Sequence, residues 1–238
     1  MKLDRLLAKH ERMGRKKARD LISSGQVRTS DGTIYDHHLE IDRFTSVYIG
    51  HEPVQTAERA LYLMLHKPIG VVSATVDREH QTVIDLIDDP DRSSLHLVGR
   101  LDRNTSGLML LTNDGRWSKA LMAPERKIAK IYHVRTLHPI RPDAVEAFAN
   151  GFYFHTEDRT TMLAHLEIIG DDEARVTLHE GLYHQIKRMF HRVENQVIAL
   201  HREQLGPFRL PDDLQPGQWI ALDKTQAWSF QQTQTNLE

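Results

Sequence analysis

Short apolar runs separated by turn residues restrict the fold of this chain more than any other feature. Strand-like runs occupy residues 61–65, 95–98, 108–111, 131–137, 163–169 and 174–178. Tyr132, Val134 and Thr136 alternate with their neighbours, as on a strand with one buried face. Helical patterns at residues 142–150 and 183–194 lie among these runs without a regular strand–helix–strand rhythm. The sequence therefore predicts the α+β class.

The first fifty residues form a separate pattern. Apolar residues recur at helical spacing over residues 3–24, and Gly25 is placed to end the second of two short helices. The Asp31-Gly32 pair between short extended segments predicts a hairpin, and residues 47–49 close the unit. We therefore expect a small domain over residues 1–50.

A polar segment separates this unit from the rest of the chain. Residues 51–59 include Pro53 and hold no long apolar run, which indicates a linker. A chain of 238 residues suits a small domain and one of ordinary size, so a larger domain is expected over residues 60–238. The tail from about residue 225 is polar and rich in glutamine, and we assign it no structure.

The absence of cysteine restricts both chemistry and compartment. It excludes disulfides, thiolate zinc sites and a cysteine nucleophile, and it fits a reducing cytoplasm. Met1 leads directly into Lys2 without an apolar signal region, and the longest apolar run, residues 61–65, is too short to cross a bilayer. We therefore expect a soluble, cytoplasmic protein with no membrane partner.

The formal net charge of −2 is an average over blocks of opposite sign. Residues 1–28 carry nine Lys and Arg against three acids, and residues 99–135 carry eight against three. Residues 77–91 hold six acids and one arginine. Because salt screens surface charges beyond about 8–10 Å, a phosphate backbone responds to such local blocks. The basic blocks are either nucleic-acid-binding faces or ordinary solvated faces.

Several familiar catalytic motifs are missing from the sequence. It contains no GxGxxG, GxxxxGK[ST], GxSxG or HExxH pattern, so dinucleotide, P-loop, hydrolase and zincin chemistry have no support. His179, His184, His191 and His201 lie near one another in the chain, but no carboxylate stands at a familiar metal-ligand spacing from them. Solvent-facing or RNA-facing roles are therefore preferred for these histidines, and no metal site is predicted.

A polar loop between two apolar strands carries a candidate catalytic acid. Gly99 and Gly107 bracket the loop, and Asp102 lies between Arg100 and Arg103. Neighbouring guanidinium groups would keep the carboxylate ionised. An ionised, fixed carboxylate can act as a nucleophile or as a general base. An ordinary Asp/Asn/Ser/Gly turn is the alternative when the loop is considered alone.

Two further segments suit nucleic acid. Tyr132 lies on the alternating strand shortly after Lys127 and Lys130, and taken alone it is a half-buried structural tyrosine. Residues 180–190 open a helix whose polar face is cationic, a general feature of phosphate binders. The residues by themselves thus indicate a two-part protein with basic faces and one candidate acid.

Together these segments resemble the RsuA-type branch of the pseudouridine synthases, over nearly the whole chain. Residues 1–50 look like an S4 (αL) RNA-binding domain. The matching catalytic motifs, in chain order, are Lys67-Pro68-Ile69-Gly70, Gly99-Arg100-Leu101-Asp102, Lys130-Ile131-Tyr132, and residues 181–190 followed by Leu200-His201-Arg202-Glu203. Four motifs in this order are specific, although each alone is weak. Leu182 and Glu194 depart from the family pattern, which leaves details of RNA contact open.

The resemblance implies a catalytic domain with a mixed, largely antiparallel sheet and a site that needs no cofactor and no metal. Asp102 takes the catalytic role, Tyr132 stacks beneath the target base, and Lys187 or Arg100 holds Asp102 as an anion. The residues expected to contact RNA are Arg5, Arg15, Lys16, Lys17, Arg19, Arg103, Lys130, His184 and Arg188.

The expected partner is ribosomal RNA, and the expected reaction is the isomerisation of one uridine to pseudouridine. The compact length, without a long basic extension at the C-terminus, is more similar to the enzymes of the small subunit and so favours 16S rRNA. A 23S rRNA synthase of the same branch is one alternative. A non-catalytic protein of rRNA binding or ribosome assembly is another. A monomer is expected.

Overall fold

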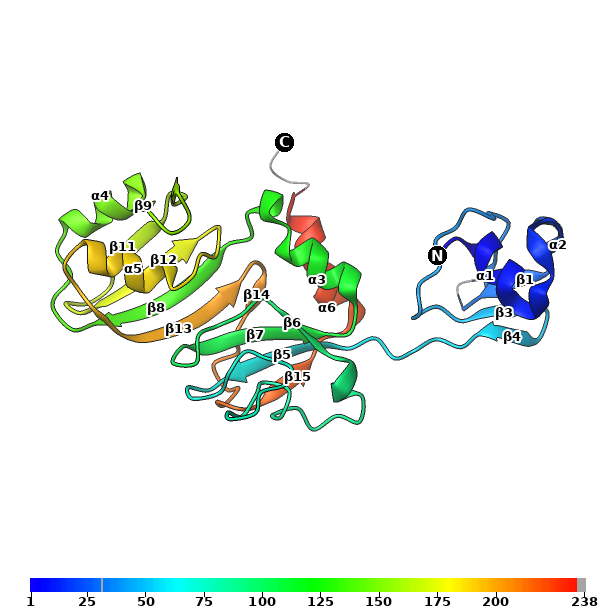
Figure 1. Ribbon diagram of the computed structural model, residues 1–238, viewed down its shortest axis with the longest axis horizontal. Helices are drawn as coiled ribbons and strands as arrows, with labels where there is room; N and C mark the ends of the chain where they lie inside the picture. The colour runs from blue at the N-terminus through cyan, green and yellow to red at the C-terminus, as the bar shows by residue number, and fades with distance from the viewer. Residues whose placement is uncertain (31, 235–238) are drawn as a thin grey trace. The chain divides into compact units, whose positions relative to one another are not determined.

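The computed structural model describes residues 1–30 and 32–234, in two compact units, residues 1–60 and 61–238. The first unit contains two helices and a four-stranded antiparallel sheet in the order β2-β1-β3-β4 (Figure 1). Its elements are α1 (Leu3–Lys9), α2 (Gly14–Ser23), β1 (Val27–Thr29), β2 (Gly32–Thr33), β3 (Val47–Ile49) and β4 (Glu52–Gln55), with a 3-10 turn at His10–Arg12. The two predicted helices are confirmed, and Asp31 of the predicted hairpin turn lies outside the described residues.

The small unit packs its helices on its sheet through one apolar cluster. Leu3, Leu7, Ala18 and Ile22 of the helices and Val27 of β1 are fully buried in it. Apolar residues on one face of each short helix therefore provide the core, since helices this short are marginal in isolation.

The linker expected over residues 51–59 is wrong in its first half, because Glu52–Gln55 forms β4 and pairs with β3. The Pro53 that suggested a linker is tolerated because β4 is the edge strand of the sheet, where a missing N–H breaks no ladder. Gly50, with φ of 57°, occupies the turn between β3 and β4.

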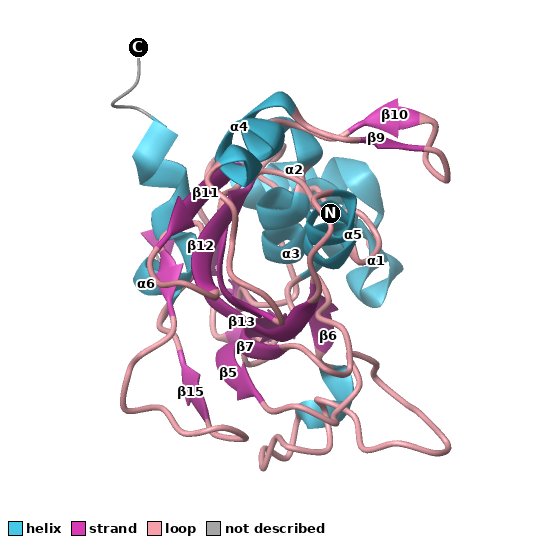
Figure 2. Ribbon diagram, turned by 90° about the vertical axis from the view of Figure 1, so that its left-hand side faces the viewer, coloured by secondary structure: helices cyan, strands magenta, loops and turns pink. Residues whose placement is uncertain are grey.

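The second unit is built on a nine-stranded mixed sheet, which confirms the predicted α+β class (Figures 1 and 2). The main strand order is β11-β12-β8-β13-β7-β5-β15, with β14 paired to β13 and β6 to β7. The strands are β5 (Tyr62–Lys67), β6 (His96–Val98), β7 (Ser106–Thr112), β8 (Lys130–Thr136), β11 (His165–Ile168), β12 (Glu173–Leu178), β13 (Val197–Leu205), β14 (Phe208–Arg209) and β15 (Trp219–Ala221). A separate hairpin joins β9 (Tyr153–Phe154) to β10 (Arg159–Thr160). The helices are α3 (Gly115–Met122), α4 (Asp143–Asn150), α5 (Gln185–Arg192) and α6 (Lys224–Trp228), and 3-10 turns occupy Arg92–Ser94, Pro124–Arg126 and Ser229–Gln234.

Two antiparallel halves of this sheet meet at one parallel strand pair. β13 runs parallel to β7, with His201 opposite Ser106 and Arg202 opposite Gly107. A Cβ on Gly107 would overlap the carbonyl oxygen of Arg202 and lie only 2.5 Å from its backbone nitrogen. Gly107 also has φ of 111°, so both the backbone conformation and the close approach require glycine here. This parallel β7–β13 pair, called the seam below, thus fixes the start of β7, into which the Asp102 loop leads directly.

Helices α4 and α5 cover one face of the half that contains β8, β11 and β12 (Figure 1). Phe148 of α4 and Phe190 of α5 are fully buried, with ring centroids 5.0 Å apart, against Val134 and Val176 of the sheet. The alternation predicted for β8 is confirmed, because Tyr132, Val134 and Thr136 are buried while Arg135 is exposed. Helix α5 is therefore anchored by its apolar side, and its cationic side is left to face the site.

The strands β5 and β7 of the other half are buried on both faces. One face meets residues of the long segment between β5 and β6, among them Val83 and Ile87, and α3 and α6 lie together on the opposite side (Figure 1). The near-continuous apolar runs of β5 and β7 follow from this double burial.

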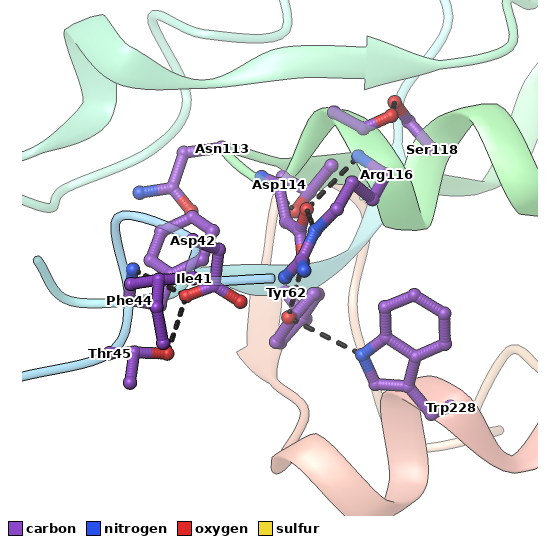
Figure 3. A network of polar contacts seen from close by, with 12 residues as sticks. Ile41, Asp42, Phe44, Thr45, Tyr62, Asn113, Asp114, Arg116, Ser118 and Trp228 are labelled. Carbon is purple, nitrogen blue, oxygen red and sulfur yellow. Dashed lines mark hydrogen bonds and ion pairs between the residues drawn. The ribbon is translucent and has the colours of Figure 1, made fainter. Parts of the chain in front are cut away.

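The tail from residue 225, which was expected to lack regular structure, is helical up to Gln234. An Asp223–Gln226 capping box starts α6, and the 3-10 turn after it extends to Gln234. The indole of Trp117 donates to the carbonyl of Ala227 at 2.7 Å, and Trp228 donates to the Tyr62 hydroxyl at 3.4 Å (Figure 3). Apolar residues spaced among the glutamines therefore dock this segment on the unit. Burial and the Asp114 carboxylate, which accepts from the Tyr62 hydroxyl at 2.9 Å, raise the pKa of Tyr62 to about 12, while its bond from Trp228 lowers it.

No helix in the described ranges has the length and apolarity needed to span a membrane.

Candidate active site

The loop that carries Asp102 is fixed from both sides by hydrogen bonds. The Ser73 hydroxyl donates to the carbonyl of Leu101 at 2.6 Å and accepts from its amide at 3.1 Å. The Gly70 amide donates to the carbonyl of Arg103 at 2.9 Å, and the Arg103 guanidinium donates back to the Gly70 carbonyl at 3.2 Å. The Lys67-Pro68-Ile69-Gly70 segment thus braces the loop before β7 begins.

The Lys187 ammonium and the His184 imidazole, both at the start of α5, lie against the Asp102 carboxylate. The Lys187 ammonium donates to Oδ2 at 2.7 Å, and Nε2 of His184 lies 3.5 Å from Oδ1. The three side chains are each between 29% and 37% exposed, so the cluster opens to solvent on one side. A short charge-assisted bond stabilises the ionised carboxylate while leaving it accessible to a substrate.

A fully buried lysine lies behind the same loop. The Lys67 ammonium donates to the carbonyl oxygens of Pro68, Thr105 and Arg103, at 3.0, 2.9 and 3.3 Å. Burial lowers the pKa of Lys67 to about 8, and the negative charge of Asp102 partly opposes this by raising it. Lys67 therefore serves as a buried cationic brace of the Asp102 loop.

We expect an alkaline fall in activity that follows Lys67. As the pH rises through about 8, Lys67 loses its charge, which weakens its bonds to the loop, so kcat/KM on RNA should fall with an apparent pKa near 8. The free energy of unfolding should rise over the same range. Between pH 8 and 10, Lys67 is protonated in the unfolded chain but largely deprotonated in the folded one, so raising the pH favours the folded state. Measured from pH 6 to 10, the unfolding free energy of wild type should therefore rise relative to that of Lys67→Met.

Lys67→Met is the matched control for both measurements, since it keeps the apolar stem and removes the titrating group. Its rate profile should lack the fall near pH 8. An unchanged profile in Lys67→Met would assign the titration to another group.

The turn that precedes α5 is held by buried polar contacts. The Gln185 side chain accepts from the Leu182 amide at 3.0 Å and donates to Glu180 at 2.9 Å, and Glu180 also accepts from the Met162 amide and from Arg159. His184 has φ of 49°, so it cannot continue the helix, and α5 begins at Gln185 and not at residue 183. The left-handed residue next to the carboxylate is a local strain of the kind found at functional sites.

Tyr132 lies on β8 in line with the parallel seam. It stands opposite Arg202 of β13, which in turn stands opposite Gly107 of β7. Its side chain is 9% exposed and belongs to the same apolar cluster as Leu101, the neighbour of Asp102. The strand order thus brings the predicted tyrosine to the base of the Asp102 loop.

Other predicted residues have partners that the sequence did not indicate. Arg188 donates two hydrogen bonds to Glu157, at 2.8 and 2.9 Å, and lies 3.6 Å over the Phe154 ring, so it ties α5 to the β9–β10 hairpin. Lys130 is half-buried and donates to the carbonyl of Ile128 at 3.1 Å, and burial lowers its pKa. Their direct contact with RNA is therefore not supported by their placement.

Arg100 is exposed, and within the described ranges the ion pairs of Asp102 are made by Lys187 and His184. In the first unit, Arg5, Arg15, Lys16 and Lys17 are exposed. Arg19 donates to buried Asp4 at 2.9 and 3.2 Å and lowers the pKa of that carboxyl. The three cations at the start of α2 are therefore open to solvent, whereas Arg19 is paired within the unit.

Sequence reasoning matched Lys67 to a motif without assigning it a role, and it missed Glu157 and Glu180 as partners of the α5 region. Lys67 was noticed because it belongs to a motif. Glu157 and Glu180 belong to pairs whose members are far apart in the sequence, and such pairs cannot be recognised from the local sequence. Across residues 1–30 and 32–234, no group of three or more His, Asp or Glu side chains could hold a metal ion.

The family model described as RNA pseudouridylate synthase matches residues 61–192 of the chain. The chain belongs to this family. A protein of Pseudomonas aeruginosa named ribosomal small subunit pseudouridine synthase A is 47% identical over 94% of this chain and 97% of its own length. Proteins of the same name from Vibrio cholerae and Escherichia coli are 38% and 36% identical, over 97% and 93% of this chain and 99% and 96% of their own.

A solved structure agrees with the sequence relatives. A crystal structure of a pseudouridylate synthase superposes with a TM-score of 0.68 at 32% identity, covering 95% of this chain and 98% of that one. The predicted membership of the RsuA-type pseudouridine synthases is thus confirmed.

Proposed function

We propose that this synthase isomerises one uridine of 16S rRNA to pseudouridine, in the cytoplasm and as a monomer, with Asp102 as the catalytic residue. Pseudouridine formation in rRNA follows from the family and its relatives. The observation that carries the proposal is the 2.7 Å bond from Lys187 to an accessible Asp102 on a braced loop. The relatives named for the small ribosomal subunit favour 16S rRNA. Within that RNA, we propose that the target is the uridine at position 516.

The geometry makes the reaction physically reasonable. A uridine must leave its stack for a protein group to reach its glycosidic bond, at a cost of a few kcal/mol. Stacking on Tyr132 would recover about 1–3 kcal/mol. Asp102 then attacks the sugar, removes a proton from it or adds to the base, and the bond from the uracil nitrogen to the sugar breaks. The uracil turns and bonds to the sugar through carbon. That carbon loses its proton, the freed nitrogen gains one, and Asp102 returns to the free carboxylate, so that the product is an isomer of the substrate. Lys187 holds Asp102 ionised before this step, and no cofactor is required in the proposal.

One experiment tests both the activity and the substrate. The purified chain is incubated with unmodified small-subunit and large-subunit rRNA, and pseudouridine is mapped by carbodiimide adducts and primer extension. We expect one new stop, in 16S rRNA. A stop confined to 23S rRNA would reject the substrate, and no stop in either RNA, free or in assembling particles, would favour a non-catalytic binding protein.

We also propose that the first unit is an S4-like RNA-binding domain. Its exposed cations at the start of α2, Arg15, Lys16 and Lys17, concentrate positive charge at that end of the helix. A phosphate backbone binds such a concentration of charge without reading sequence.

Neutralising these three residues to glutamine should lower rRNA affinity and flatten its salt dependence. Each phosphate that is no longer neutralised reduces the slope of log K against log salt by about 1. The measurement is filter binding of an rRNA fragment between low and physiological salt. A triple substitution of Arg135, Arg141 and Arg175 changes the charge equally, but these guanidinium groups already pair with acids, so its slope should stay near that of wild type. An unchanged slope in the α2 variant would remove this helix from the interface.

A further inference from the structure

An exposed aromatic ring, that of Tyr183, directly precedes His184 in the sequence, and His184 lies against the Asp102 carboxylate. Tyr183 is 72% exposed, the largest value for an aromatic residue in the described ranges. Single exposed apolar residues are common on protein surfaces, so exposure alone implies nothing. The position of this ring does, because its neighbour His184 lies 3.5 Å from Asp102.

Tyr183 and His184 form a stacked pair beside Asp102. Their ring centroids are 3.9 Å apart, with planes inclined by 17°. One face of the tyrosine is therefore covered by the imidazole, and the high exposure leaves the other face open. The His184 imidazole thus has Asp102 beyond its Nε2 edge and the Tyr183 ring on its face.

The backbone under this pair is rigid. The Tyr183 carbonyl accepts from Arg188 at 3.1 Å, and Arg188 is held in turn by Glu157. The preceding residue, Leu182, is fixed by Gln185. A ring on a fixed turn, already stacked on one face, loses little conformational freedom when a second flat group stacks on the other.

We propose that Tyr183 is a second stacking platform, for the unpaired base of a nucleotide adjacent to the target uridine. This inference rests on the proposed rRNA substrate. A uridine extruded towards Asp102 leaves its neighbours unstacked, and every base has a flat face that an aromatic ring can accept. Tyr183 thus binds the flanking nucleotide, and the isomerisation itself needs only the groups around Asp102.

The test compares Tyr183→Ala and Tyr183→Phe on a short rRNA substrate that wild type modifies. Stacking of about 1–3 kcal/mol corresponds to roughly 5- to 150-fold, so Tyr183→Ala should raise KM and the RNA Kd within that range and leave kcat within about twofold. Tyr183→Phe should match wild type, since it keeps the ring. Leu137→Ala, which truncates another exposed apolar residue of the same unit, should leave all three values unchanged.

A substrate series separates stacking from other effects of the substitution. When the flanking nucleotides on either side of the target are made abasic in turn, one of the two RNAs should bind wild type and Tyr183→Ala equally, because the partner of the ring is gone. With 2-aminopurine at that position, fluorescence should be quenched on binding to wild type and Tyr183→Phe but not to Tyr183→Ala.

Two results would contradict the proposal that Tyr183 stacks on a flanking base. One is an unchanged KM in Tyr183→Ala, and the other is an equal penalty on the native and on both abasic substrates. Inactivity of wild type itself on rRNA would instead contradict the proposed function, so the two failures can be told apart.

Discussion

Replacing Asp102 with asparagine should abolish pseudouridine formation while leaving RNA affinity within a few-fold. Asparagine keeps the shape of the side chain but provides neither a nucleophilic carboxylate nor a general base. Loss of a group that acts directly on the substrate costs more than about 1,000-fold in kcat. The measurement is single-turnover pseudouridine formation with enzyme in excess, together with the RNA Kd.

The matched control is Asp172→Asn, which removes a carboxylate paired with Arg135 on the outer part of the same unit and should keep full activity. Asp102 is only partly buried, so the Asp102→Asn variant should also unfold near the wild-type denaturant concentration. A variant retaining more than a tenth of wild-type activity would refute the assigned role.

Replacing Gly107 with alanine should destabilise the catalytic unit by more than about 3 kcal/mol. The added Cβ would overlap the Arg202 carbonyl oxygen, and φ of 111° is unfavourable for any L side chain. Because the clash is with the backbone of the neighbouring strand, a rotamer change cannot relieve it. Urea unfolding followed by tryptophan fluorescence is selective, because all three tryptophans lie in residues 61–238.

Gly115→Ala provides the control for this measurement. Gly115 opens α3, and a Cβ added there would meet no other atom within 4 Å, so alanine should be neutral or slightly stabilising. Equal midpoints for the two variants would mean that the β7–β13 seam can separate without cost.

The elements with a clear periodicity were predictable from the sequence. The alternation around Tyr132 defined β8, and the apolar stripe of residues 183–194 defined α5 to within two residues at each end. The left-handed His184 ended that agreement, because backbone strain next to a site has no local sequence signal. β4 was not predicted because it contains Pro53. Proline is tolerated in an edge strand, but a sequence does not show which strand lies at an edge.

The residues of the candidate site also fall into a predictable and an unpredictable group. Asp102, Tyr132 and Lys187 followed from motif order, and the structure places Lys187 on Asp102. The prediction that Arg188 and Lys130 contact RNA rests on charge alone, because a sequence does not show the protein partners that these side chains have. Lys67 was recognised only as part of a motif, since burial of a cation behind a loop depends on residues far along the chain.

The pairing of β5 with β15 has a consequence for the order in which this protein is made. Leu63 and Leu65 near the start of the catalytic unit pair with residues 219–221, and the Trp117 indole bonds to Ala227. Pairings between such distant residues form slowly, and here one partner is synthesised long after the other. The first unit can fold while translation continues, whereas the large sheet is completed only after residues 219–221 have been synthesised. A product that ends before these residues therefore lacks β15, although it can contain the complete first unit.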